Sequence, residues 1–322
     1  MTHPPLVAVT CGEPAGVGPE IAADAWKALR EDVPMIWIGD PRHLPKGTPI
    51  AQVVDPAEAH AICATHMPVL THEFLAVPTP GVPDLSCSQA VIDVIARGVS
   101  LVQSGGSQAL CTAPIHKKVL KDGAGFAFPG HTEFLAHLAG DVDVVMMLAS
   151  EQLRVVPATI HVALSDVAHL LTPDLLRSVL QITNKSLQTQ FGVENPRIAV
   201  AGLNPHAGEG GAMGREEVNW ITELVTEMSK QMNVTGPHSA DTMFHAAARK
   251  SYDAAVCMYH DQALIPIKTL DFDRGVNVTL GLPFVRTSPD HGTAFDIAGR
   301  GIANPTSMIE ALRMAHRMAG AT

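Results

Sequence analysis

The stretch 6-LVAVTCGEPAGVGPE-20 decides the fold class, because it carries a short Val-rich apolar run through a glycine-rich turn into the start of an amphipathic segment. The run Leu6–Thr10 is typical of a buried strand, and a helix is expected over Glu20–Arg30. Apolar runs of this kind alternate with longer amphipathic stretches along the rest of the chain. This alternation predicts an α/β protein with a largely parallel sheet.

The same periodicities predict the other elements. Strands are expected at Met35–Gly39, Ala109–Ala113, Val144–Ala149, Leu153–Thr159, Arg197–Ala201, Ala254–Met258 and Val276–Thr279. Helices are expected at Ser88–Val102, Thr132–Ala139, Pro173–Gln190, Arg215–Met232 and Pro305–Met318. Residues 40–85 are rich in Pro, Thr and His with weak periodicity, so a loop-rich region is expected there.

The composition is that of a globular chain. Its 322 residues, 46% of them apolar, can fill a large core at roughly 150 residues per domain, which excludes a disordered protein. Clean apolar runs such as Val144–Ala149 are far shorter than the roughly 18 residues of a membrane span. The first ten residues carry no secretory signal. We therefore expect a soluble cytoplasmic protein that does not contact a membrane.

Cysteine spacing and net charge exclude two further classes of protein. The five cysteines form no CxxC pair, and their odd number argues against a disulfide framework. A net charge of -10 and a pI near 5.8 argue against nucleic acid as a partner. An anionic small ligand would then need a local concentration of positive charge.

The glycine-rich turn over residues 11–20 is a first candidate site. Gly16 and Gly18 let the backbone approach a ligand closely, and the start of a helix attracts negative charge. A Rossmann fingerprint would need a third glycine near position 21, where Ile21 stands, so that motif is excluded. A tight turn at a strand-to-helix junction is the structural alternative.

Histidine is unusually abundant, since the 16 histidines outnumber Phe, Trp and Tyr taken together. Three of them, His161, His206 and His260, stand where a predicted strand meets a loop, which is where open α/β sheets assemble their sites. Three neutral imidazoles suit Zn²⁺, Co²⁺, Ni²⁺ or Mn²⁺ better than Mg²⁺. Their wide separation matches no local metal motif, so placement by chance is the alternative.

Basic and polar residues gather in two glycine-containing stretches. PGHTEF holds His131 and Thr132, and residues 268–294 hold Lys268, Asn277 and Arg286. Arginine offers a bidentate fork for carboxylate or phosphate, and lysine offers a point charge. In an acidic protein this set predicts an anion site, with solvated loop charges as the alternative.

Two aspartates near the histidine segments are candidates for proton transfer. Asp241 and Asp261 could orient imidazoles or move protons. Both could equally be helix caps, which is the favoured interpretation of Asp241.

Several of these stretches together resemble a known family. They are GEPAGVGPE, GHTEF, VVMMLAS, GLNPHAGEGG, MYHDQALIPIK and RGVNVTLGLPFVRTSPDHGTA. In order and spacing they are similar to the 4-hydroxythreonine-4-phosphate dehydrogenases of vitamin B6 biosynthesis, the PdxA family. The resemblance runs from about residue 6 to 319 and is weak over 40–85. The string HGTAFDIAGRGIANP at 291–305 also looks like the cofactor loop of isopropylmalate and isocitrate dehydrogenases.

The resemblance implies the fold and the assembly. Two α/β domains of the isocitrate/isopropylmalate dehydrogenase-like type are expected, with the active-site cleft between them. The first would hold residues 1–130 and 290–322, and the second residues 131–289 with the metal-ligand segments and dimer contacts. Members of the family form homodimers, so a homodimer that shares its metal site between subunits is expected.

The resemblance also implies residue roles. His161, His206 and His260 would bind one divalent metal ion, whereas the wider dehydrogenase kin use aspartates. The phosphorylated substrate would be bound by His131, Thr132, Lys268, Asn277 and Arg286. NAD would be bound by Gly16, Gly18, His291, Gly292, Asp296 and Asn304, and the Asp296 carboxylate would repel the 2′-phosphate of NADP. Asp241, Asp261 or a neutral histidine would accept the proton.

The implied reaction is a metal-dependent oxidation by NAD. Its substrate would be 4-phosphooxy-L-threonine, and its product 2-amino-3-oxo-4-phosphooxybutanoate would decarboxylate to 3-amino-2-oxopropyl phosphate. A related dehydrogenase of 4-phospho-D-erythronate or threonate is the nearest alternative. A phosphate acyltransferase-like enzyme and an inactive metal-binding regulator are more remote ones.

Overall fold

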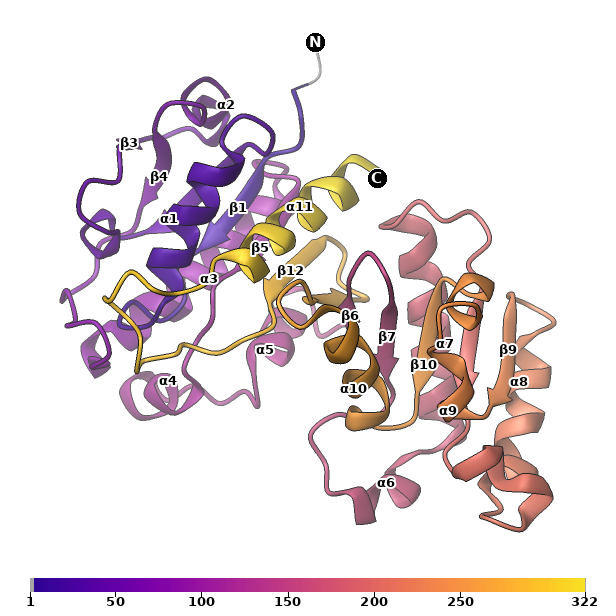
Figure 1. The fold of residues 1–322 in the computed structure, drawn as a ribbon. Helices are drawn as coiled ribbons and strands as arrows, with labels where there is room; N and C mark the ends of the chain where they lie inside the picture. The colour runs from indigo at the N-terminus through magenta and orange to yellow at the C-terminus, as the bar shows by residue number, and fades with distance from the viewer. Residues whose placement is uncertain (1–2, 322) are drawn as a thin grey trace. The chain divides into compact units, whose positions relative to one another are not determined.

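The computed structural model describes residues 3–321, which form two compact units. The first unit contains the chain up to Val144 and again from Leu282, and the second contains Val145–Gly281 (Figure 1). The sequence placed these boundaries at 130/131 and 289/290. They differ because residues 131–144 pack on the first unit, where Phe134 meets Phe126 and Phe128, and because the strand at 285–289 pairs there too.

The first unit is built on parallel strands in the order β3-β4-β2-β1-β5-β12. Its central strands are almost wholly apolar, as expected of a sheet covered on both faces. The strands are β1 (Val7–Thr10), β2 (Met35–Gly39), β3 (Ile50–Gln52), β4 (Met67–Thr71), β5 (Ala109–Thr112) and β12 (Val285–Pro289).

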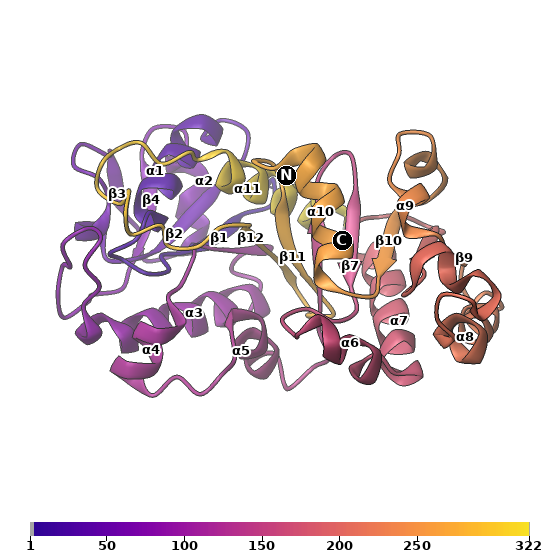
Figure 2. The same ribbon diagram turned by 60° about the horizontal axis from the view of Figure 1, so that its bottom comes forward.

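Helices cover both faces of this sheet (Figure 2). Helix α1 (Gly18–Leu29) and helix α11 (Thr306–Ala321) pack together on one face, and α3 (Ser88–Gln103) packs on the other. Helix α11 begins where predicted, because Asn304 Oδ1 accepts hydrogen bonds from the backbone N and the hydroxyl of Thr306. The shorter helices are α2 (Ala59–Ile62), α4 (Lys117–Ala124) and α5 (His131–Leu138).

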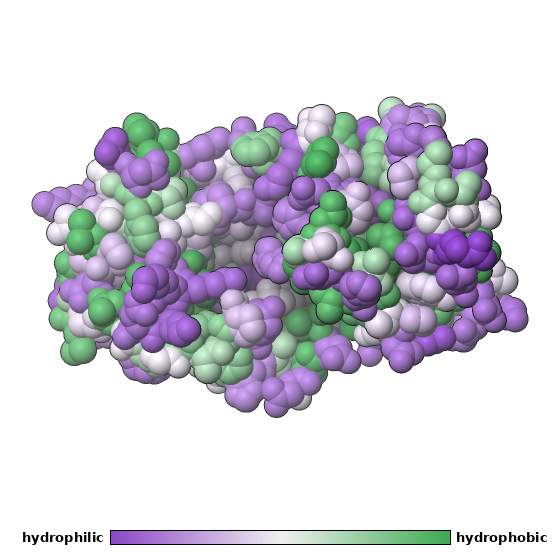
Figure 3. Space-filling view, turned by 90° about the horizontal axis from the view of Figure 1, so that it is seen from below, coloured by the Kyte–Doolittle hydropathy of each residue, from purple (hydrophilic) through white to green (hydrophobic). Residues whose placement is uncertain are grey.

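Helix α3 belongs to a long apolar segment of the chain. Together with the turn before it, residues 85–103 are long and hydrophobic enough to cross a membrane by length and composition. Val94, Ile95 and Val99 are nevertheless buried against the strands, as in the core helix of a globular unit. On the face drawn in Figure 3, hydrophilic and hydrophobic residues are interspersed rather than gathered into one apolar band.

The second unit has a mixed sheet in the order β11-β6-β7-β10-β8-β9. The last four strands run parallel to one another, whereas β6 is antiparallel to both β11 and β7. The sheet is therefore less uniformly parallel than the sequence predicted. The strands are β6 (Val145–Ala149), β7 (Arg154–Pro157), β8 (Ile198–Ala201), β9 (Val234–His238), β10 (Ala254–Cys257) and β11 (Val276–Leu280).

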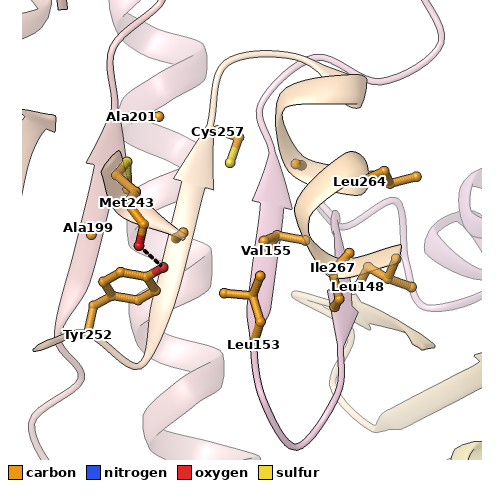
Figure 4. Close-up of a cluster of buried hydrophobic side chains, with 12 residues drawn as sticks. Leu148, Leu153, Val155, Ala199, Ala201, Met243, Tyr252, Cys257, Leu264 and Ile267 are labelled. Carbon is orange, nitrogen blue, oxygen red and sulfur yellow. Dashed lines mark hydrogen bonds between the residues drawn. The ribbon is translucent and has the colours of Figure 1, made fainter. Parts of the chain in front are cut away.

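Helix α10 (His260–Asp271) covers one face of this sheet and seals a buried cluster (Figure 4). Leu264 and Ile267 of α10 pack towards Val155 of β7, and Tyr252 donates its hydroxyl hydrogen to Met243 O at 2.9 Å. The remaining helices are α6 (Leu164–Leu170), α7 (Pro173–Thr189), α8 (Thr222–Met228) and α9 (Ala240–Met243).

Several elements differ from the sequence predictions for identifiable reasons. Helix α10 was missed because Pro266 stands inside it, and proline ordinarily breaks a helix. The helix predicted over Arg215–Met232 is shorter, with a π-helical turn at Glu217–Ile221 before α8. Strands β3, β4, β9 and β12 were also missed, since they are short or contain Pro, Gly or polar residues.

Candidate active site

The carboxyl edge of the second unit's parallel strands brings the predicted metal ligands into one region. His161 follows β7, His260 begins α10 directly after β10, and His206 lies in the turn after β8. Asp241 lies in α9, after β9. Because β7, β10, β8 and β9 are adjacent and parallel, all four side chains come from the same edge of the sheet.

Hydrogen bonds tie the ends of these strands together. Thr159 donates its hydroxyl hydrogen to Met258 O at 2.8 Å, which joins the segment before His161 to the segment before His260. Gln262 accepts from Met258 N at 2.7 Å and donates to Gly202 O at 2.8 Å. The Gln262 amide thus links the end of β10 to the loop that leads to His206.

His161 and His260 lie close to the spacing of a ligand pair. Their ring centres are 5.8 Å apart. Two imidazoles bound to one zinc ion at about 2.0–2.1 Å would have ring centres roughly 4.5–5.5 Å apart. The Asp261 carboxylate lies 2.7 Å from His260 Nδ1, an arrangement that leaves Nε2 for a metal ion. These residues therefore fit a divalent ion that prefers nitrogen ligands.

His206 is not part of such a pair. Its side chain is exposed, and its positive charge, when present, helps to lower the pKa of Asp241. Within residues 3–321, no three His, Cys, Asp or Glu side chains are close enough to hold a metal ion together. The structure thus pairs His161 with His260 and places His206 near Asp241, while convergence of all three histidines stays a prediction.

The two candidate proton acceptors have different surroundings. The Ser239 hydroxyl donates to Asp241 at 2.6 Å and lowers the pKa of that carboxyl, with a smaller contribution from His206. Asp241 is therefore ionised at neutral pH, and its lowered pKa makes it a weak base. Asp261 is exposed and contacts His260, so its position suits orienting that imidazole better than taking a substrate proton.

The predicted anion-binding residues fall in both units. In the second unit, the Lys268 ammonium lies 5.5 Å from the Phe272 ring centre. Asn277 Oδ1 on β11 is buried and has no hydrogen-bond partner within the described chain. His131, Thr132 and Arg286 belong to the first unit.

Arg286 is a buried cation on β12. Only 3% of its surface is exposed, and Thr112 at the end of β5 accepts from its Nη2 at 2.6 Å. Burial lowers the pKa of Arg286 to about 10. Burial, and then the nearby Arg286, hold the pKa of His131 well below its ordinary value, so His131 is neutral near pH 7.

His131 and Thr132 begin helix α5, where backbone N–H groups favour an anion. The His131 Nε2 atom is buried without a hydrogen-bond partner among residues 3–321. With Arg286 nearby, these residues form a local positive region in an otherwise acidic chain.

The glycine-rich turn contacts another part of the chain rather than open space. A Cβ on Gly16 would lie 2.8 Å from Thr293 O, and one on Gly18 would lie 2.9 Å from Cys11 O. Val17 N donates to Thr293 O at 2.9 Å, and Glu20 accepts from Gly299 N. The turn is thus packed on the loop at 291–301, which holds three of the six residues expected to bind NAD.

The other expected NAD residues lie on or beside that loop. His291, Gly292 and Asp296 are exposed, so they are accessible to a ligand. Asn304 is also exposed, with its Oδ1 engaged in capping α11. The first unit therefore brings the turn and the loop together, while their binding of a cofactor stays a prediction.

The Gly16→Ala variant should lose stability and NAD affinity together. The added methyl group collides with Thr293 O and must displace the loop at 291–301, and overpacking of this kind costs about 1–3 kcal/mol. Urea unfolding and the KM for NAD are the measurements. Gly320→Ala in helix α11 is the matched control, since its Cβ would meet only Pro5 at 3.8 Å. An unchanged KM for NAD in this variant would contradict a role of the turn in cofactor binding.

Sequence reasoning missed the residues that support the candidate ligands. Thr112 was part of a predicted strand, and a polar residue ending an apolar run at the sheet edge was the available signal. Gln262 stands two residues after His260 but carries no motif of its own. Glu217 fell inside the helix expected at Arg215–Met232 without a role of its own, although it is buried and bonded to Asn204.

Comparison with known proteins gives consistent matches over nearly the whole chain. The model of the PdxA family, described as pyridoxal phosphate biosynthetic protein PdxA, matches residues 31–315. The 4-hydroxythreonine-4-phosphate dehydrogenase of Ruegeria sp. (strain TM1040) is 64% identical over 317 residues, which are 98% of this chain and 97% of that protein.

Solved structures match in the same way. A 4-hydroxythreonine-4-phosphate dehydrogenase from Klebsiella pneumoniae has a TM-score of 0.89 and 37% identity, covering 98% of this chain and 99% of that one. A branched-chain phosphotransacylase from Enterococcus faecalis V583 has a TM-score of 0.58 at 17% identity, covering 97% of this chain and 99% of that one, and shares the fold alone.

Proposed function

This chain belongs to the PdxA family of pyridoxal phosphate biosynthetic proteins, and from that premise we propose that it oxidises 4-phosphooxy-L-threonine with NAD and one divalent metal ion. Relatives matching at high identity are named dehydrogenases, so the chain is an oxidoreductase. The observation that carries the proposal is the edge of the second unit, where His161, His206 and His260 follow three adjacent parallel strands.

The proposed ligands of the metal ion are these three histidines. Zn²⁺, Co²⁺, Ni²⁺ or Mn²⁺ is favoured over Mg²⁺ because the donors are imidazole nitrogens. When bound, the ion would supply a Lewis acid that lowers the pKa of a substrate hydroxyl, and NAD would supply the hydride acceptor. Asp261 fixes the orientation of the His260 ring through Nδ1.

The proposed substrate anion contacts are the five residues that the family resemblance implies. Arg286 binds phosphate or carboxylate, and the neutral His131 and the start of α5 add hydrogen-bond donors. Lys268 and Asn277 are the other two proposed contacts of the substrate. Binding the remote phosphate positions the reacting hydroxyl and so lowers the barrier without any new chemistry.

The proposed product is a β-keto acid. Oxidation of the hydroxyl gives 2-amino-3-oxo-4-phosphooxybutanoate, NADH and a proton, and loss of CO2 from that acid gives 3-amino-2-oxopropyl phosphate. A polarised ketone beside the carboxylate favours this loss. Asp241 and Asp261 lie beside the histidines, and one of these carboxylates or a neutral imidazole that does not bind the metal ion would accept the proton.

The proposed assembly and cofactor site follow the family. NAD binds along Gly16, Gly18 and the loop with His291, Gly292, Asp296 and Asn304. The protein acts in the cytoplasm as a homodimer that shares its metal site between subunits.

The test is NADH formation by the purified full-length protein supplied with Zn²⁺ or Co²⁺. We expect turnover of 4-phosphooxy-L-threonine that stops after chelation and dialysis and returns when the ion is restored. The same assay with 4-phospho-D-erythronate separates the nearest alternative, because that acid carries hydroxyl in place of the amino group. Faster turnover of the sugar acid, or none of either acid, would refute the proposed substrate.

A further inference from the structure

The turn that carries His206 has an unusual backbone. Five consecutive residues, 206–210, have φ between +42° and +79°, and three of them, His206, Ala207 and Glu209, are not glycine. Side chains disfavour this left-handed region, so such a run persists only where surrounding contacts hold it.

Glu217 makes the contacts that hold this turn. Its side chain is almost completely buried, with 2% of the residue exposed. Its Oε1 accepts from Asn204 N at 2.8 Å, and its Oε2 accepts from Asn204 Nδ2 at 2.9 Å. Asn204 precedes His206 by two residues, so the carboxylate fixes the point at which the turn begins.

The carboxylate also lies against the inside of the turn. A Cβ on Gly208 would lie 2.7 Å from Glu217 Oε2, and one on Gly202 would lie 3.2 Å from Oε1. The turn therefore closes around the carboxylate, and only glycine fits at position 208.

A second carboxylate reinforces the arrangement. Glu216 Oε2 accepts from Asn204 Nδ2 at 2.7 Å, so the amide donates to both glutamates. The π-helical turn that starts at Glu217 replaces ordinary helix at this point, and such turns recur at functional sites. Two charge-assisted bonds to one amide are stronger than neutral ones.

We propose that Glu217 is a positioning residue for metal binding, because its carboxylate holds Asn204 and the left-handed turn and so fixes His206 at the carboxyl edge of β8. This inference rests on the proposed function, in which His206 is a metal ligand. A buried carboxyl group is costly unless its oxygens are hydrogen-bonded, and the bonds that Glu217 accepts come from the segment that carries His206. In this role Glu217 acts through Asn204 and the turn, and it is not itself proposed as a ligand.

The test compares Glu217→Gln with the wild-type protein by calorimetric titration of Co²⁺ alone into the full-length chain. The variant keeps the size of the side chain but turns an N–H₂ group towards the Asn204 amide, so a donor faces a donor. Losing such a supporting contact weakens metal binding by about 10–100-fold. Glu223→Gln, an exposed glutamate in α8, is the matched control and should bind Co²⁺ like the wild type.

A second variant keeps the inference testable if Glu217→Gln does not fold. Asn204→Ala leaves Glu217 in place and removes the amide that both glutamates share, so Co²⁺ binding should weaken in the same direction. If both single variants fold, the double variant should bind no more weakly than the worse single one, because both act through one contact.

The outcomes separate this inference from the proposed function. If the wild type binds Co²⁺ and folded Glu217→Gln binds it equally well with only a lower Tm, Glu217 is merely structural and the inference is overturned. If the wild type binds no Co²⁺, the metal role in the proposed function is overturned, and the inference falls with it.

Discussion

Replacing His206 with alanine should reduce metal-dependent NADH production by about 10³-fold or more, because a metal ion that loses a ligand no longer stabilises several kcal/mol of developing charge. The fold should survive this change. His206 is exposed, and the neighbouring Ala207 already adopts the same left-handed backbone with a φ of +51°, so this turn accommodates alanine. The variant therefore separates chemistry from folding.

The measurement is kcat with saturating Co²⁺, alongside Co²⁺ affinity and Tm. His169→Ala is the matched control, since His169 is an exposed histidine in α6 with no proposed role. Wild-type turnover by His206→Ala, above all after chelation and dialysis, would contradict the assignment of His206 as a metal ligand.

Replacing Arg286 with methionine should raise the KM for the phosphorylated substrate by about 10²-fold while leaving the KM for NAD nearly unchanged. Truncating one partner of a buried charged hydrogen bond costs about 2–5 kcal/mol of binding. The loss should fall on the phosphorylated substrate, because Arg286 contacts Thr112 and lies near His131. Neither of these two residues belongs to the loop at 291–301 that is proposed to bind NAD.

The stability of Arg286→Met should be maintained or raised. The pKa of Arg286 is lowered to about 10 in the fold, so folding disfavours its charged form at neutral pH, and methionine removes that cost. Urea unfolding checks this expectation, with exposed Arg313→Met as the control for loss of an arginine. Equal rises in the KM for substrate and for NAD would argue for a displaced fold instead of a lost anion contact.

Much of the fold could be predicted because burial is one-sided in the helices. Val91, Ile95 and Val102 of α3 repeat with helical spacing and are buried, and the prediction of 88–102 differs from α3 by one residue. Helix α10 resisted prediction because Pro266 gives a helix-breaking signal that the packing of Ile267 overrides. Strand β12 was hidden because its buried Arg286, Thr287 and Ser288 read as a polar loop.

The sequence predicted at which strand ends the candidate site residues lie, but not the distances between their side chains. His161, His206 and His260 could be assigned to strand ends, since each follows an apolar run in the sequence. The pairing of His161 with His260 depends on β7 lying beside β10, a long-range arrangement that local periodicity does not contain. The role of Glu217 could not be predicted for the same reason, because it depends on the turn that folds around this side chain.

The division of the chain has a consequence for how the protein is made on the ribosome. Residues 145–281 form one uninterrupted unit and can fold as soon as they emerge. The other unit must wait, because β12 and α11 are synthesised last and complete the sheet beside β5. Until then β5 has no neighbouring strand on that side, and Arg286 has not yet been synthesised. The nascent chain therefore completes the edge with the three histidines before Arg286 is in place, and chaperone binding and aggregation are most expected while the first unit is unfinished.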